Sequence, residues 1–171
     1  MNRIILNSDV INELIKNNNL NFQTKFQKEN GKNYFFNQTI SLCLYNPKVA
    51  WIDSTKKNIS FSFNKHEHLN LFIMLRYINE KLIQLYNNKI GVNLSIHSFF
   101  YEKDDFFYIK CYLPNIHSKK YLIKSYFNSN EDKFNVPRLG TIYSSVILDI
   151  RNIWEKNNKV GFNLELKEVH I

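Results

Sequence analysis

Apolar and polar residues alternate along several short stretches of the chain, a period of two that is typical of strands with one buried face. These stretches cover residues 34–45, 49–53, 59–63, 92–101, 106–113, 121–127, 141–154 and 160–169. Turn-forming residues bound most of them, as Asn46-Pro47 and Pro114-Asn115 do. The pattern therefore predicts a mainly β chain.

One long stretch has helical spacing instead. Between Glu67 and Asn88 the apolar residues fall on one face of a helix, and Gly91 follows its end as a stop signal. That face comprises Leu71, Leu75, Ile78, Leu82 and Leu85. A shorter helix is predicted over residues 8–16, where Ser8 stands at the capping position.

The order of these elements suggests an architecture. Three strands precede the long helix and the other strands follow it, and a five-stranded oligonucleotide-binding (OB) barrel is a compact way to close such strands and remove their edges. We expect a mainly β fold with one long helix (β+α), arranged as an OB-like antiparallel barrel with additional C-terminal strands. At 171 residues the chain suits one domain over 1–171, in which residues 1–30 form an N-terminal helix and arm.

The predicted hairpin over residues 92–113 sorts rings and a cation onto one face. That face comprises Phe99, Tyr101, Phe106, Tyr108, Lys110 and Tyr112. The opposite face of its second strand holds Phe107, Ile109, Cys111 and Leu113, as a core does. Binding to a single nucleic-acid strand needs this combination, because bases stack on rings while cations neutralise phosphates. The alternative is that the rings cover a second core, since sheets are commonly covered on both faces.

Further candidates for the same site lie on neighbouring strands and turns. They are Trp51, Lys56, Lys57, Lys119, Lys120, Lys124, Tyr126 and Arg138. The formal net charge of +8 favours a polyanionic partner. An AT-rich coding sequence also enriches Lys, Asn, Phe and Tyr, so charge and ring content carry less weight than the face on which they lie. For Trp51 and Trp154 the alternative to ligand binding is a semi-buried position within a strand.

Enzymatic chemistry finds little support in the motifs. The chain has no phosphate-binding glycine loop, cysteine pair or nucleophile elbow. His66 and His68 are two positions apart and do not share a helical face, so a helix start explains them better than a metal. Asp149 with Glu165 and Lys167 superficially resembles the metal-holding set of a nuclease superfamily, although a solvated strand face explains Glu165 and Lys167 equally well. We expect no catalytic residues, no metal and no cofactor.

The C-terminal part carries a resemblance to a known group of proteins. Residues 140–154 form an apolar strand that ends in Trp154, and a turn then leads to a final strand with Gly161 near its start. This run resembles the end of divergent OB-fold single-stranded-DNA-binding proteins, which occur in large cytoplasmic DNA viruses and AT-rich cytoplasmic linear plasmids. The resemblance implies a protein that coats single strands during replication. It supplies no ligand positions, so the site prediction depends on the strand faces.

Together these features predict a non-enzymatic, cytoplasmic protein that binds single-stranded DNA through a basic groove and aromatic stacking. RNA is the alternative ligand, and homo-oligomers or replication proteins are candidate further partners. The rival interpretation is a protein-interaction subunit of a viral-type replication or transcription complex, because aromatic residues are also enriched at protein interfaces. No membrane partner is expected, because the sequence has no apolar run of about 18 residues. Cys43 and Cys111 fit reduced positions in or near a core.

Overall fold

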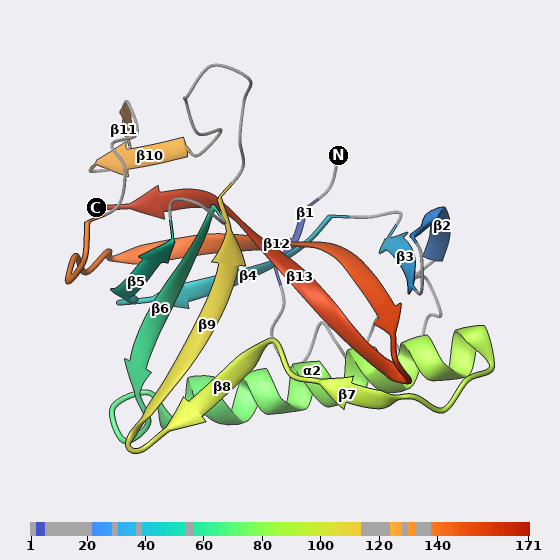
Figure 1. The fold of residues 1–171 in the computed structure, drawn as a ribbon. Coiled ribbons are helices and arrows are strands. Elements are labelled where there is room, and N and C mark those ends of the chain that lie inside the picture. Colours follow the sequence, from blue (N-terminus) through green and yellow to red (C-terminus); the bar gives the residue numbers. More distant parts are fainter. Residues whose placement is uncertain are drawn as a thin grey trace. The chain divides into compact units, whose positions relative to one another are not determined.

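A computed structural model of the chain (Figure 1) describes residues 3–5, 22–28, 31–36, 39–53, 57–113, 124–127, 130–132 and 138–171. Within these residues the fold is mainly β with one helix, as predicted, and the strands make a single mixed sheet that is not closed into a barrel. The chain divides into two compact units. Unit 1 comprises Met1–Ser41, His68–Phe99 and Ile150–Asn163, and unit 2 comprises Leu42–Glu67, Phe100–Asp149 and Leu164–Ile171. The helix predicted over residues 8–16 lies outside the described residues.

The long helix of unit 1 is α2, Leu69–Ile90. Its predicted apolar face is confirmed, since Leu75, Ile78, Leu82 and Leu85 are buried and only Leu71 is half-buried. The helix ends where Gly91 adopts a left-handed φ of 74° and donates its N–H to the Asn87 carbonyl. The sequence predicted Gly91 as the stop signal, and the helix extends two residues beyond the predicted end at Asn88, to Ile90.

The strands of unit 1 include a hairpin of β2 (Phe22–Lys28) and β3 (Gly31–Phe36), which are antiparallel. β3 also pairs with β12 (Ser145–Lys156), and β13 (Lys159–His170) pairs in parallel with β7 (Ser95–His97). β1 (Arg3–Ile5) pairs in parallel with β4 (Thr39–Tyr45). The single strand predicted over residues 34–45 is therefore two strands, and β4, β12 and β13 contribute residues to both units.

Unit 2 contains the sheet region that matters for the site. The strands predicted over residues 49–53 and 59–63 are β5 (Lys48–Asp53) and β6 (Asn58–Asn64), which form an antiparallel pair. Figure 1 shows β6 next to β9 (Phe106–Tyr112), and β9 next to β8 (Phe100–Lys103), both as antiparallel pairs. β13 pairs with β9 in parallel, and β10 (Lys124–Phe127) pairs with both β13 and β11 (Asn130–Asp132).

The core of unit 2 lies on one side of β6 and β9. Ile59, Phe61 and Phe63 of β6 are directly opposite Cys111, Ile109 and Phe107 of β9, and these side chains are almost completely buried. The rings of Phe63 and Phe107 stack with their centroids 5.1 Å apart. Each such side chain stabilises the fold by about 1.5–3 kcal/mol relative to exposure. The alternation over residues 106–113 thus separates buried side chains from outward-facing ones, as predicted.

Several expectations about strands differ from the structure. The strand predicted over residues 92–101 is split into β7 and β8, because Phe99 and Phe100 are both buried and consecutive burial breaks the alternation. Ile96, an apolar residue of that alternating stretch, is exposed. The alternation predicted no strand over residues 130–132, which form β11. An OB-like barrel is not confirmed, because the described strands form an open sheet with parallel pairings between distant parts of the sequence.

Candidate nucleic-acid interface

The outward side of β9 carries the predicted rings and cation. Phe106 is 40% exposed, Tyr112 is 45% exposed, Lys110 is exposed and Tyr108 is half-buried. Between them, Phe107 and Ile109 are completely buried. β9 therefore separates a core face from a face that a ligand can reach.

A second strand enlarges this face with a stacked pair of tyrosines. Tyr101 of β8 is directly opposite Tyr108 of β9 and is 51% exposed. The two rings are parallel within 11°, with their centroids 4.9 Å apart, and the ring of Phe106 lies 6.5 Å from that of Tyr108. An offset-stacked arrangement is favourable for aromatic rings, so the pair is held in place by its own packing.

The strand register extends the same face across β6 and β5. Tyr108 is opposite Ser62, which is opposite Lys48, and Lys110 is opposite Ser60, which is opposite Trp51. Trp51 is 46% exposed, so its indole is more accessible than its strand position suggested. The small side chains of β6 separate the rings of β9 from the larger residues of β5. Seven residues of this face are here named the ring surface, and all except the half-buried Tyr108 are exposed: Lys48, Trp51, Tyr101, Phe106, Tyr108, Lys110 and Tyr112.

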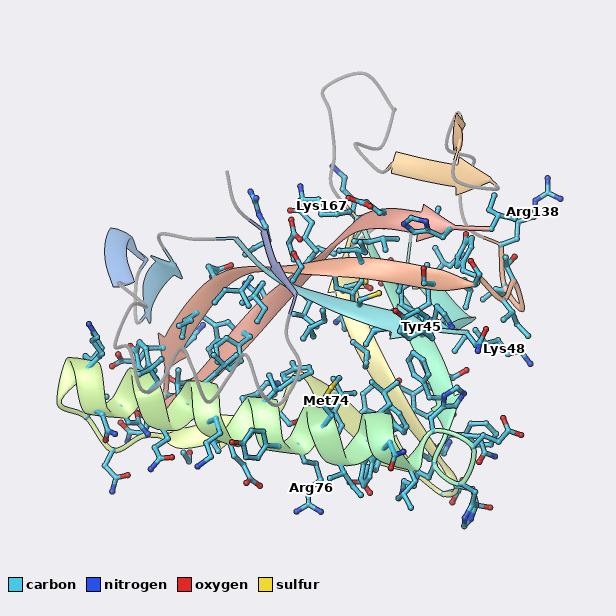
Figure 2. The ribbon with its side chains drawn as sticks, turned by 180° about the vertical axis from the view of Figure 1, so that it is seen from behind. Tyr45, Lys48, Met74, Arg76, Arg138 and Lys167 are labelled. Atoms are coloured by element: carbon cyan, nitrogen blue, oxygen red, sulfur yellow. The ribbon has the colours of Figure 1, made fainter. Side chains whose placement is uncertain are left out.

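A loop brings a further cation to the β5 side of this sheet. Lys48 forms an antiparallel bridge with Ile142. The Val49 N–H donates to the Thr141 carbonyl, and the Gly140 N–H donates to the Val49 carbonyl, both at 2.8 Å. Arg138, which is exposed, lies in the turn that leads into this segment. Lys48 and Arg138 are both labelled in Figure 2. The structure thus connects a predicted loop residue to the edge of the ring surface.

The turn between β8 and β9 has the opposite charge. It contains Asp104 and Asp105, and Glu102 precedes it. Lys65 Nζ lies 2.9 Å from Glu102 Oε2 and donates to the Asp104 carbonyl at 3.0 Å, while His66 Nε2 lies 3.8 Å from Asp105 Oδ1. Exposed ion pairs of this kind stabilise a fold by at most about 1 kcal/mol. Glu102 is opposite the buried Phe107 and so lies on the core side of the sheet, whereas Lys103, opposite Phe106, lies on the side of the exposed rings.

The other predicted site residues fall into three groups. Lys57 is exposed at the start of β6, with a left-handed φ of 53°. Lys124 and Tyr126 lie on β10, opposite Glu168 and His170 of β13. The residues outside the described part of the chain are Lys56, Lys119 and Lys120.

Phe99 was predicted to be an exposed ring and this was wrong. It is 7% exposed, and its ring packs edge-on against Phe162 with a centroid distance of 6.4 Å. Conversely, Lys48 and Ile142 were not predicted for the site. The alternation through Lys48 and Val49 could have indicated the lysine, but a register shift between Val49 and Trp51 interrupts it before the tryptophan.

The residues of the two metal alternatives make other contacts in the structure. The described residues contain no group of three or more His, Cys, Asp and Glu side chains that could hold a metal ion. Glu165 and Lys167 form an ion pair, and Asp149 on β12 is buried. His66 and Glu67 donate their backbone N–H groups to Asn64 Oδ1, and the His68 carbonyl accepts the N–H of Phe72, so this run forms the start of α2.

Two comparisons with known proteins give no relative for this chain. No protein-family model matches it, and a search of the curated proteins finds no match either. Among the described residues there is no helix of sufficient length and apolar character to cross a membrane. The functional argument therefore depends on the ring surface itself.

Proposed function

We propose that this chain binds single-stranded nucleic acid, with single-stranded DNA as the expected ligand, through the ring surface. The observation that carries the proposal is the stacked pair of Tyr101 and Tyr108, with Phe106 beside it, on the outward side of β8 and β9, where the opposite side of β9 is almost completely buried. Every base has a flat face that stacks on such rings, and each stacked base contributes about 1–3 kcal/mol.

The charges on and beside this surface suit the same ligand. Lys48 and Lys110 belong to the ring surface, and Arg138 lies beside its β5 edge. Cations next to stacked bases neutralise the phosphates that link those bases. A cytoplasmic role in coating DNA during replication remains part of the proposal. It is not needed for the ring surface to bind.

Salt dependence tests the proposal directly. Binding of a fluorescein-labelled thymidine oligonucleotide is measured by anisotropy between 50 and 200 mM salt. If Lys48, Lys110 and Arg138 each neutralise one phosphate, log K falls with log salt at a slope of about −2, from about −0.7 per phosphate on a single strand. Absence of binding at the lowest salt would refute the proposed function.

Ring removal then locates the binding to this surface. Tyr101→Ala and Tyr108→Ala should each weaken binding by roughly 5- to 150-fold, the equivalent of one stacked base. Tyr45→Ala is the matched control, because Tyr45 is exposed in unit 2 but does not belong to the ring surface. Equal effects of the control and the test variants would assign the binding elsewhere. Circular dichroism melting verifies that each variant is folded.

The second candidate function is a protein-interaction subunit. The observation that favours it is the carboxylate-rich turn beside the rings, since interfaces combine aromatic anchors with mixed charges at the rim. Failure to bind any single-stranded oligonucleotide, together with stable folding, would favour this function. A magnesium-dependent cleavage assay tests the nuclease alternative separately.

A further inference from the structure

We infer that unit 1 contains a docking groove for an extended peptide that carries a basic side chain. The groove, here named the β7 groove, has a volume of about 560 Å³ and lies between one face of α2 and residues 92–96. Figure 1 shows β7 running alongside α2. All of the described lining residues belong to unit 1, whereas the ring surface belongs to unit 2, so this inference does not depend on the proposed nucleic-acid function.

The backbone edge of β7 that faces away from β13 is free. Among the described strands β7 pairs only with β13, and Ser95, opposite Lys159, donates its N–H to the Asn158 carbonyl at 3.3 Å. Alternate residues of a strand direct their N–H and C=O groups to the same neighbour, so those of Ile96 point away from β13. No described residue forms a hydrogen bond with either group. This edge therefore offers one donor and one acceptor to a ligand.

An amide already occupies the preceding position of the same edge. Asn87 Nδ2 donates to the Leu94 carbonyl at 3.2 Å, and the Leu94 N–H donates to Asn87 Oδ1 at 3.4 Å. A residue of an added antiparallel strand would exchange the same two hydrogen bonds with Leu94. Ile96 lies two residues further on and lines the same groove as Asn87 and Leu94. A peptide amide at Ile96 would thus continue the pairing that the Asn87 side chain begins.

The lining of the β7 groove determines which peptide fits. Its α2 wall is a single helical face, on which Glu80, Gln84 and Asn88 are exposed at intervals of one turn. Glu80 carries the only charge among the described lining residues. A carboxylate repels phosphate and attracts an ammonium or guanidinium group, so we expect a lysine or arginine of the peptide beside Glu80. Backbone hydrogen bonds at a strand edge would then supply affinity and this ion pair would supply specificity.

Proline at position 96 tests whether the edge is free. Proline lacks the N–H, but a strand tolerates it where the N–H faces away from the sheet. Ile96→Pro should therefore melt close to the unchanged protein. Ser95→Pro is the matched control, because it removes the hydrogen bond to the Asn158 carbonyl and should lower the melting temperature by at least about 2 °C. A loss at Ile96→Pro as large as that of the control would overturn the inference.

Peptide binding is measured on the unchanged protein from backbone amide signals in ¹H–¹⁵N NMR spectra. The probes are three capped pentapeptides, Val-Lys-Val-Lys-Val, Val-Thr-Val-Thr-Val and Val-Glu-Val-Glu-Val. The lysine peptide should shift the Ile96 signal and bind about 2- to 5-fold more tightly than the threonine peptide, and the glutamate peptide should bind most weakly. Glu80→Gln should remove this order. Glu67→Gln, which changes an exposed glutamate of unit 2, should leave it unchanged.

The donor at the edge is tested in the same titration. Ile96→Pro should weaken binding of the lysine peptide at least about 5-fold, whereas Ile96→Val, which retains the N–H, should not. Equal affinities of the three peptides, or no shift of the Ile96 signal at several millimolar peptide, would overturn the inference. So would a shift caused only by adenosine or uridine, or only by raising the protein concentration, since the occupant would then be a nucleoside or a second copy. None of these results bears on the ring surface, which oligonucleotide binding tests.

Discussion

Replacing Gly161 by alanine tests the register of β12 and β13 in unit 1. A methyl group on Gly161 would lie 2.6 Å from Cε2 and 3.0 Å from Nε1 of Trp154, and closer still to Cζ2. Carbon atoms in contact are normally about 3.5–4.0 Å apart. The neighbouring atoms belong to the body of a rigid indole, so the whole ring must move.

The expected cost follows from two opposing effects. Overpacking of this kind costs about 1–3 kcal/mol, and the displaced indole also loses its contact with the ring of His97, whose centroid is 5.2 Å away. Replacing glycine by alanine restricts the unfolded chain and returns about 0.4–1 kcal/mol. We expect Gly161→Ala to lower the free energy of unfolding by about 1–2 kcal/mol, as measured by urea denaturation followed by circular dichroism.

A double-mutant cycle shows whether the indole causes this loss. In a Trp154→Leu background the ring that obstructs the methyl group is absent, so Gly161→Ala should be neutral or stabilising by up to about 1 kcal/mol. An equal loss in both backgrounds would refute the reasoning. Stabilisation of the protein that retains Trp154 by Gly161→Ala would refute it as well.

Three further predictions concern buried polar and titratable groups. Asn79→Leu should raise the free energy of unfolding by about 1–2 kcal/mol, because the buried Asn79 Oδ1 has no hydrogen-bond partner. The control Asn88→Leu, on the exposed side of α2, should change the free energy of unfolding by less than about 0.5 kcal/mol. Burial, and secondarily the charge of Glu165, raises the pKa of the Cys111 thiol, so mass spectrometry after iodoacetamide treatment at pH 8 should find Cys43 alkylated before Cys111. Burial also raises the pKa of Tyr143 above its ordinary 10.0. The contribution of the neutral phenol to stability is complete below pH 10 and is lost as pH rises through the folded-state pKa. Tyr143→Phe should therefore make the free energy of unfolding depend less on pH above pH 10.

Local patterns of the sequence were sufficient to predict the long helix and the two faces of β9. The alternation over residues 106–113 predicted which side chains of β9 are buried, because one core covers that face along the whole strand. The helical spacing over residues 67–88 predicted α2 and its buried face for the same reason. Both patterns arise because one face of the element is buried along most of its length.

Features that depend on distant partners were not predictable in this way. Lys48 belongs to the ring surface only because β5 pairs with β6 and β6 with β9, and the shift in register beside Trp51 has no signature in the periodicity. Phe99 and Phe100 are both buried, although alternation allowed only one of them to be. The parallel pairing of β13 with β9 likewise joins residues far apart in sequence, so no local pattern indicates it.

Several tight turns of the chain use asparagine, and the whole chain contains only 4 glycines. Asn46, Asn157 and Asn158 adopt left-handed φ values of 52–59°, which asparagine tolerates better than most residues. Asn157 and Asn158 join β12 to β13, the two longest strands among the described residues. A two-residue asparagine turn is therefore sufficient to reverse the chain between long strands without glycine.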